Sequence, residues 1–209
     1  MKTLAFIAQK GGSGKTTLAV HMAICATRKN LRTALIDLDP QGSAYDWNES
    51  RDDGNKLDAV KASPGQLAAL LKQAKAAGAD LVIVDTAPHS DSAAAVTAQL
   101  ADFVLIPCRP ARFDLKAIGS TAQITGLAKT PAAVVINAAP RGKLAEEARA
   151  ALQHQGITVI ETVLHHRAAY SHAVIDGRSV HEYEPDGKAA AEIDELFACV
   201  QRILKLLAK

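Results

Sequence analysis

Residues 4–17 of this chain read Leu-Ala-Phe-Ile-Ala-Gln-Lys-Gly-Gly-Ser-Gly-Lys-Thr-Thr. The first five are apolar and fit a buried strand, and the apolar residues that follow Thr17 predict a helix packed beneath a sheet. Glycines between them let the backbone curl so that several N–H groups point inward, and the following helix adds its positive N-terminal end. The stretch therefore predicts a phosphate-binding loop between a strand and a helix.

Each residue of this loop has a predicted task in holding a nucleoside triphosphate. Backbone amides would surround the phosphates, and they belong to Gly11, Gly12, Ser13, Gly14, Lys15, Thr16 and Thr17. The Lys15 ammonium would reach the β- and γ-phosphates, and the Thr16 hydroxyl would be a magnesium ligand. An ordinary glycine-rich turn with surface lysines is the alternative, and the strand–loop–helix context argues against it. ATP with Mg²⁺ is thus the predicted cofactor, and cleavage of the γ-phosphate is the predicted reaction.

The rest of the chain repeats short apolar runs separated by helical stretches. The runs do not alternate with polar residues, so they fit strands buried on both faces: 4–8, 34–36, 81–84, 103–106, 133–136 and 157–160. Helices are expected at 17–27, 65–77, 114–127, 143–155, 168–175 and 188–207. This alternation predicts an α/β fold, a doubly wound, mostly parallel sheet with helices on both faces, in one domain over residues 1–209. The stretch 48–64 is expected to be an exposed excursion.

Composition excludes several other classes of protein. The 209 residues are 48% hydrophobic and 22% charged, which is typical of a globular chain. The net charge of +2 is too small to indicate a nucleic-acid partner by itself. No apolar run reaches the length of about 18 residues that a membrane span needs, and no signal peptide is visible. The three cysteines form no CxxC pair and fit small buried side chains in a reducing compartment, so we expect a cytoplasmic protein.

Three aspartates stand at predicted strand ends, where ligands of such sheets bind. Asp37 and Asp39 follow the strand 34–36, and Asp85 follows the apolar run 81–84. Carboxylates one residue apart could simply be solvated in a loop. Beside a phosphate-binding loop, however, a hard cation needs oxygen ligands, which favours a metal role for Asp37 and Asp85.

Lys10 adds a second lysine to the loop, and this feature points to a family. The common pattern begins with a glycine where this chain has Gln9; the chain instead has KGGxGKT. The loop resembles the deviant Walker A motif of the ParA/MinD family of ATPases. That resemblance implies that Lys10 crosses the interface of an ATP-sandwiched homodimer and contacts the partner's phosphates, as an arginine finger does. A solvated lysine on the loop is the alternative.

The resemblance extends over nearly the whole chain. Asp37-Leu38-Asp39-Pro40-Gln41 is similar to the family's switch I segment, and Asp85-Thr86-Ala87-Pro88 to its Walker B and switch II. It implies that Asp37 holds a magnesium-bound water, that Asp39 orients the attacking water as a catalytic residue with Lys10 and Lys15, and that Asp85 orders the magnesium shell.

Two further residues stand where the family binds the base. Asn137 ends the strand 133–136, where the family's asparagine recognises adenine, and an amide can both donate to and accept from the ring edge. Arg109 lies in the segment Pro107-Cys108-Arg109-Pro110, which resembles the family's proline-containing loop near the nucleotide. Either segment could be merely a strand-ending turn.

The C-terminal part resembles that of small ParA-type partition proteins, which implies binding to non-specific DNA. The candidate residues are Arg167, Arg178, Lys188 and Arg202. Contacts of this kind go to phosphates and need charge without base readout. A solvated face of mixed charge is the alternative, because acidic residues lie among them. The nucleotide-binding strand begins at residue 2, so no N-terminal helix-turn-helix is expected.

The resemblance thus predicts a partition ATPase that is nucleoid-associated, with a ParB-like or other cargo adaptor that stimulates hydrolysis. A MinD-like protein would instead bind membrane through an amphipathic C-terminal helix. The apolar stripe of 193–207 predicts a final helix that packs on the sheet, and no membrane partner is expected. In this helix the acidic residues come first and the basic residues follow, which matches the helix dipole. A helix that lies on a membrane would more often carry lysines and arginines along its whole polar face. A biosynthetic ligase of the same fold would not need Lys10. An iron–sulfur ATPase would need cysteines near residues 86–88, and there are none.

Overall fold

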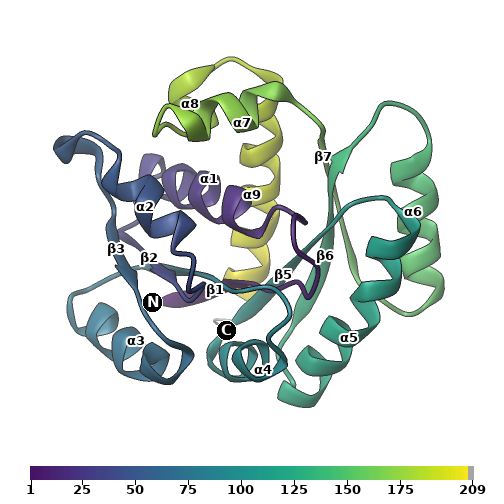
Figure 1. Cartoon of the computed structure of the whole chain (residues 1–209), viewed down its shortest axis with the longest axis horizontal. Helices are drawn as coiled ribbons and strands as arrows, with labels where there is room; N and C mark the ends of the chain where they lie inside the picture. The colour runs from purple at the N-terminus through teal and green to yellow at the C-terminus, as the bar shows by residue number, and fades with distance from the viewer. Residues whose placement is uncertain (207–209) are drawn as a thin grey trace.

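The computed structural model describes residues 1–206 as a twisted sheet of seven parallel strands between two layers of helices (Figure 1). The strand order is β3-β2-β4-β1-β5-β6-β7. The strands are β1 (Lys2–Phe6), β2 (Thr33–Asp37), β3 (Asp58–Lys61), β4 (Leu81–Asp85), β5 (Phe103–Cys108), β6 (Ala132–Ala139) and β7 (Val159–His165). This arrangement confirms the predicted fold class.

Helices cover both faces of the sheet (Figure 1). One layer consists of α1 (Lys15–Arg28), α2 (Ser43–Glu49), α7 (Ala168–Ile175), α8 (Val180–Tyr183) and α9 (Lys188–Leu206). The other layer consists of α3 (Leu67–Ala76), α4 (Asp91–Leu100), α5 (Arg112–Ala128) and α6 (Leu144–His154). Short 3₁₀ turns lie at Asp53–Asn55 and Pro64–Gln66.

The strands divide their apolar side chains between two cores. Leu4 and Phe6 of β1 face the layer of α1 and α9, whereas Ala5 and Ile7 face the layer of α3 to α6. Every residue of β4 is buried, so its side chains contact helices on both sides. This explains why the sequence of each central strand is continuously apolar, with no alternation.

The connections reverse direction at β1, which lies between β4 and β5. From β1 the chain winds outward through β2 and β3, and after β4 it crosses to the other half of the sheet. A crevice at the carboxyl ends of the strands forms at such a switch point. The loop after β1 and the ends of β2 and β4 all meet there, which is where the predicted site residues lie.

The stretch 48–64 is more ordered than predicted. Residues 58–61 form β3, which pairs in parallel with β2 from Ala34↔Asp58 to Asp37↔Lys61. The prediction of a simple excursion was wrong because an edge strand with half-exposed residues carries little apolar signal. Three helices, α2, α4 and α8, were not predicted, and β7 extends to His165, beyond the predicted 157–160.

The last helix packs on the body of the protein, as its apolar stripe predicts. Its buried side chains belong to the same core as α1 and β7: Ile193, Leu196, Phe197, Val200 and Leu204. The predicted stripe ended at Leu207, which lies outside the described residues. Over residues 1–206, we find no helix with the length and apolar character that a membrane crossing requires.

Candidate nucleotide site

The loop between β1 and α1 has the backbone conformation that its glycines predict. Gly12 and Gly14 have positive φ angles of 71° and 97°, and Gly14 is the left-handed N-cap of α1. A Cβ atom on Gly14 would lie 2.2 Å from Nδ2 of Asn137, so another residue there would displace this side chain and would be strained at this φ angle. No side chain caps α1, which leaves the amide groups of its first turn directed toward a ligand.

Asn137 braces this loop from β6. Its Nδ2 donates a hydrogen bond of 2.7 Å to the Ser13 carbonyl, and the side chain is buried. Sequence reasoning placed Asn137 near the nucleotide but missed this contact, because no sequence pattern reports a bond across 124 residues. Recognition of adenine by Asn137 stays a prediction.

Lys15 extends from the start of α1 into the site and is only 6% exposed. Burial lowers the pKa of its ammonium group, and the charges of Asp85 and Asp39 act in the opposite direction. The neighbouring carboxylates thus favour the charged form of a lysine that burial has already stripped of most of its water. This arrangement suits a group that binds phosphate oxygens.

Asp85 ends β4 and lies directly beneath the loop. The Thr16 hydroxyl donates to Asp85 Oδ2 at 2.6 Å, and the other oxygen of this fully buried carboxylate has no hydrogen-bond partner. Burial raises the pKa of Asp85 to about 7, although the Thr16 hydrogen bond lowers it. Because Thr16 uses its proton on Asp85, its oxygen lone pairs are free to accept a cation.

Asp37 stands beside Asp85 in the sheet, since β2 and β4 pair in register at Asp37↔Asp85. Its Oδ1 accepts from the Asp39 N–H at 2.9 Å, and its Oδ2 accepts from the N–H groups of Ala44 and Tyr45 at 2.9 and 3.0 Å. Asp37 therefore also caps the N-terminal end of α2, a role that sequence reasoning missed. Burial raises its pKa, and these three backbone hydrogen bonds lower it.

The residues present fit a magnesium nucleotide. Asp37 and Asp85 are buried side by side near Lys15, so ionising both carboxylates would place two negative charges beside one positive charge. The Ser13 hydroxyl and Asp85 Oδ1 are buried polar atoms without partners. A divalent cation with phosphates would supply the missing charge and hydrogen-bond partners. Thr16 would hold the cation, with Asp37 and Asp85 around it, and bound magnesium would neutralise the phosphate oxygens.

Lys10 lies at the mouth of the site and has a partner within its own chain. Its Nζ is 2.8 Å from Oδ2 of Asp114 in α5, and its side chain is 40% exposed. Arg109 lies over the loop, with its Nη2 at 3.7 Å from the position of a Cβ on Gly12. Asp39 is held by its own turn, because its Oδ1 accepts from the Gln41 N–H at 2.9 Å.

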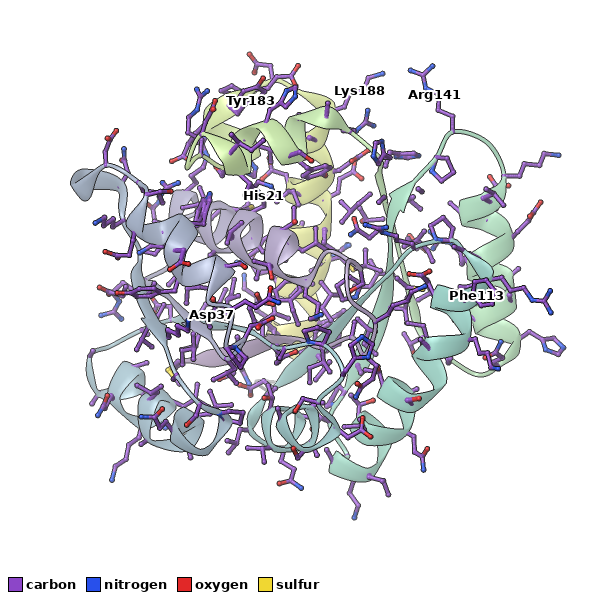
Figure 2. The ribbon with its side chains drawn as sticks, viewed as in Figure 1. His21, Asp37, Phe113, Arg141, Tyr183 and Lys188 are labelled. Carbon is purple, nitrogen blue, oxygen red and sulfur yellow. The ribbon has the colours of Figure 1, made fainter. Side chains whose placement is uncertain are left out.

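The four predicted DNA-binding residues do not form one patch. Arg167 is bound through Nε and Nη2 to the buried Glu192. Arg178 pairs with Asp176 and lies over the Tyr183 ring at 5.0 Å. Lys188 begins α9 and points to solvent (Figure 2), whereas Arg202 is fourteen residues further along that helix, or about 21 Å.

These features define the class of protein: a P-loop ATPase, with a glycine loop, a buried lysine and strand-end carboxylates at the switch point of a parallel sheet. Residues 4–180 match the CobQ/CobB/MinD/ParA nucleotide binding domain. The chain belongs to this family, and it is an ATPase of the ParA type.

Similar proteins cover the chain from end to end. It is 32% identical over 201 residues to the maintenance of carboxysome distribution protein A of Halothiobacillus neapolitanus, covering 91% of each chain. It is 26% identical to the protein ParA of Rhizobium radiobacter, covering 100% of this chain and 99% of the other. In fold it resembles MinD of Pyrococcus horikoshii, solved with Mg-ADP, with a TM-score of 0.81 at 15% identity and coverage of 100% and 99%. It also resembles apo McdA of Cyanothece, with a TM-score of 0.77 at 17% identity over the whole of both chains.

Replacing Asp85 tests the buried charge directly. The folded pKa of about 7 lies above the ordinary 3.8, so the ionised group costs stability as pH rises between these values. In the absence of Mg²⁺, Asp85→Asn should therefore be more stable than the wild type at pH 8, by at most about 4 kcal/mol, and close to it at pH 4. Urea unfolding at both pH values measures the difference, with the exposed Glu195→Gln as control. Equal destabilisation of Asp85→Asn at both pH values would contradict the account.

Replacing Lys15 tests the phosphate site. Lys15→Ala removes the ammonium group at the start of α1 and should weaken ATP binding at least about a hundredfold, which corresponds to about 3 kcal/mol. Calorimetric titration with Mg-ATP measures this, and the exposed Lys72→Ala on α3 serves as a charge-matched control. Normal affinity in Lys15→Ala would remove the assignment of the loop.

Proposed function

We propose that this chain is a ParA-type positioning ATPase that moves cargo by a nucleotide-driven cycle. ATP with Mg²⁺ binds the loop and drives a sandwich homodimer, the dimer binds DNA non-specifically, and a cargo-bound adaptor, ParB-like or otherwise, stimulates hydrolysis. The observation that carries the proposal is Lys10, a second lysine at the open mouth of a site that already has Lys15. A monomeric enzyme of this fold has no evident need for it.

The relatives support a role in positioning. One is named for the maintenance of carboxysome distribution and another is a ParA protein, and both match over nearly the whole chain. Whether the cargo of this chain is a plasmid, a chromosome or another body is set by the adaptor and not by the nucleotide site.

Lys10 has the properties that a residue acting on a second subunit requires. Its pair with Asp114 is partly exposed, and such pairs contribute only about 0.2–1 kcal/mol, so the ammonium can change partners at small cost. The phosphates of an opposing nucleotide offer more negative charge than one carboxylate. In the proposed dimer, Lys10 leaves Asp114 and stabilises the charge that develops on the partner's γ-phosphate.

Hydrogen bonds hold the two predicted switch segments at the site. In the first, 37–43, the Asp37 carboxylate joins the site to the N-terminal end of α2. In the second, 85–90, the His89 N–H donates to the Gln9 carbonyl at 3.1 Å, which ties this segment to the beginning of the phosphate loop. A nucleotide bound in the loop would change the surroundings of both Asp37 and Gln9, and would therefore affect both segments together. We propose that this coupling controls dimerisation and DNA affinity.

We propose a DNA-binding surface that keeps Lys188 of the four predicted residues and adds Arg141, which was not predicted. Arg141 follows β6 and Lys188 begins α9; both are exposed, and both extend outward along the upper edge of the view in Figure 2. Unlike Arg167 and Arg178, neither is held by an ion pair among the described residues. Free cations of this kind suit phosphate contacts without base readout.

The MinD-like alternative is less well supported. Membrane binding through the last helix would need its apolar stripe to be exposed, and Ile193, Leu196 and Phe197 are instead buried in the core.

Lys10→Ala tests the dimer. Binding of Mg-ATP to the monomer should stay within about threefold of the wild type, because Lys15 and the loop amides are intact. ATP-dependent dimerisation and turnover should both be lost, by about a thousandfold in turnover. Analytical ultracentrifugation and phosphate release measure them, with Lys72→Ala as control. A variant that dimerises and turns over normally would show that Lys10 has no role across an interface.

Binding to random-sequence DNA tests the partner class. With ATP, the protein should bind DNA with an affinity that falls steeply as salt rises, and the double variant Arg141→Ala/Lys188→Ala should bind more weakly with a shallower slope. Fluorescence anisotropy across a salt series measures this, with Arg178→Ala as the ion-paired control and anionic liposomes in parallel. ATP-dependent binding to liposomes without DNA binding would contradict the partition proposal and favour a membrane cycle.

A further inference from the structure

A second cluster of reactive side chains lies at the far end of α1 from the phosphate loop. Cys25 stands ten residues after Lys15 on that helix, about 15 Å along its axis. It meets His181 of α8 and Asp194 of α9, and one ligand atom of each lies within 4.8 Å of the others. The nucleotide chemistry uses none of these three residues.

His181 is the unusual member of this cluster. Its side chain is only 4% exposed, yet neither ring nitrogen has a hydrogen-bond partner. Nε2 is 3.4 Å from Asp194 Oδ2, which is close enough for an ion pair but lacks hydrogen-bond geometry. A buried imidazole without partners costs free energy, and a bound ligand would remove that cost.

The spacing of the cluster is close to that around a small cation, and small side-chain movements would bring all three ligand atoms to it. His181 Nε2 is 3.4 Å from Asp194 Oδ2, and Cys25 Sγ, which is 3.4 Å from the other oxygen of this carboxylate, lies within 4.8 Å of both ligand atoms. Tetrahedral zinc with bonds of about 2.0–2.3 Å places its ligand atoms about 3.3–3.7 Å apart. We propose that Cys25, His181 and Asp194 form a binding site for a borderline divalent transition metal, of which Zn²⁺ is the best match.

The donor set and its charge agree with this metal. Thiolate and imidazole favour zinc over magnesium or calcium, and one thiolate with one carboxylate balances a dication. Burial raises the pKa of the Cys25 thiol to about 12, so the ion must displace the thiol proton into solvent on binding. Lys29 lies 3.0 Å from Asp194 Oδ1, where it can stay and orient the carboxylate while Oδ2 takes the ion.

His21 is close by but is not a fourth ligand. It lies one helical turn before Cys25 on α1, and its Nδ1 accepts a hydrogen bond from the Val180 N–H at 3.3 Å. The proton of the neutral ring is therefore on Nε2, and that nitrogen has no lone pair for a metal. The Asp194 side chain is 47% exposed, so the fourth position opens to solvent and would be taken by water.

Such a site would join three helices of one layer. Cys25 belongs to the helix that begins at the phosphate loop, whereas His181 and Asp194 belong to the segment that closes over it. Metal bound there would stabilise the packing of α8 and α9 against α1. The nucleotide site would still form without it, because the phosphate loop, Asp37 and Asp85 lie at the other end of α1.

Zinc binding by four forms of the full chain tests the proposal. Equilibrium dialysis of Zn²⁺ in excess Mg²⁺, which occupies the nucleotide carboxylates, should give one tightly bound ion per chain. Cys25→Ser and Asp194→Asn should each weaken binding at least about tenfold. Cys199→Ser, which changes another free cysteine on α9, should bind as the wild type does. With Co²⁺, a thiolate-to-metal charge-transfer band should appear in the wild type and Cys199→Ser, and not in Cys25→Ser.

Two results would overturn the site. One is a wild type that binds no zinc under these conditions. The other is binding of equal strength in all four proteins, because the ion would then lie elsewhere. Circular dichroism and urea midpoints measured without metal establish that the variants are folded. Asp194→Asn removes one ligand with the least disturbance of the core, because the Asp194 side chain is half-exposed.

Discussion

Two carboxylates buried side by side at the ends of neighbouring strands are the constraint on which this molecule depends. Asp37 and Asp85 pair in register at the carboxyl ends of β2 and β4, and both are fully buried. Like charges at this depth raise the free energy of the folded chain unless cations oppose them. Lys15 supplies part of the opposing charge, and magnesium with its nucleotide would supply the rest. The site is therefore most stable when it is loaded.

Hydrogen bonds and one ion pair connect the charged site to segments at the surface of the protein. Asp37 is at once a strand-end carboxylate and the cap of α2, so its surroundings affect the segment after β2. Asn137 holds the phosphate loop from the opposite half of the sheet. Lys10 rests on Asp114 of α5, a neighbour it can exchange for phosphate. Through these contacts, a change of charge in the nucleotide site would alter segments that a partner molecule can bind.

Much of this arrangement could be predicted from the sequence. The glycine motif predicts the phosphate loop. The continuous apolar runs predict the parallel sheet and the strand-end positions of Asp37 and Asp85. Both patterns are local in sequence. The edge strand β3 was missed because half-exposed edge residues carry weak patterns, and α4 was missed because its small residues give no clear stripe.

Contacts between distant segments could not be predicted in the same way. The brace from Asn137, the pair of Lys10 with Asp114 and the engagement of Arg167 by Glu192 join residues 25 to 124 positions apart. Its charge and the family resemblance made Arg167 a candidate for DNA binding, and only the fold shows that its guanidinium is already bound. A basic residue in a sequence therefore indicates a surface contact only after its internal partners are known.

A crystal structure of the protein with Mg²⁺ and a non-hydrolysable ATP analogue tests the central claim most directly. The account predicts phosphates against the amides of residues 11–17, the Lys15 ammonium on their oxygens, and the cation on the Thr16 hydroxyl above Asp85. A ligand bound elsewhere, with the glycine loop free of phosphate, would contradict it.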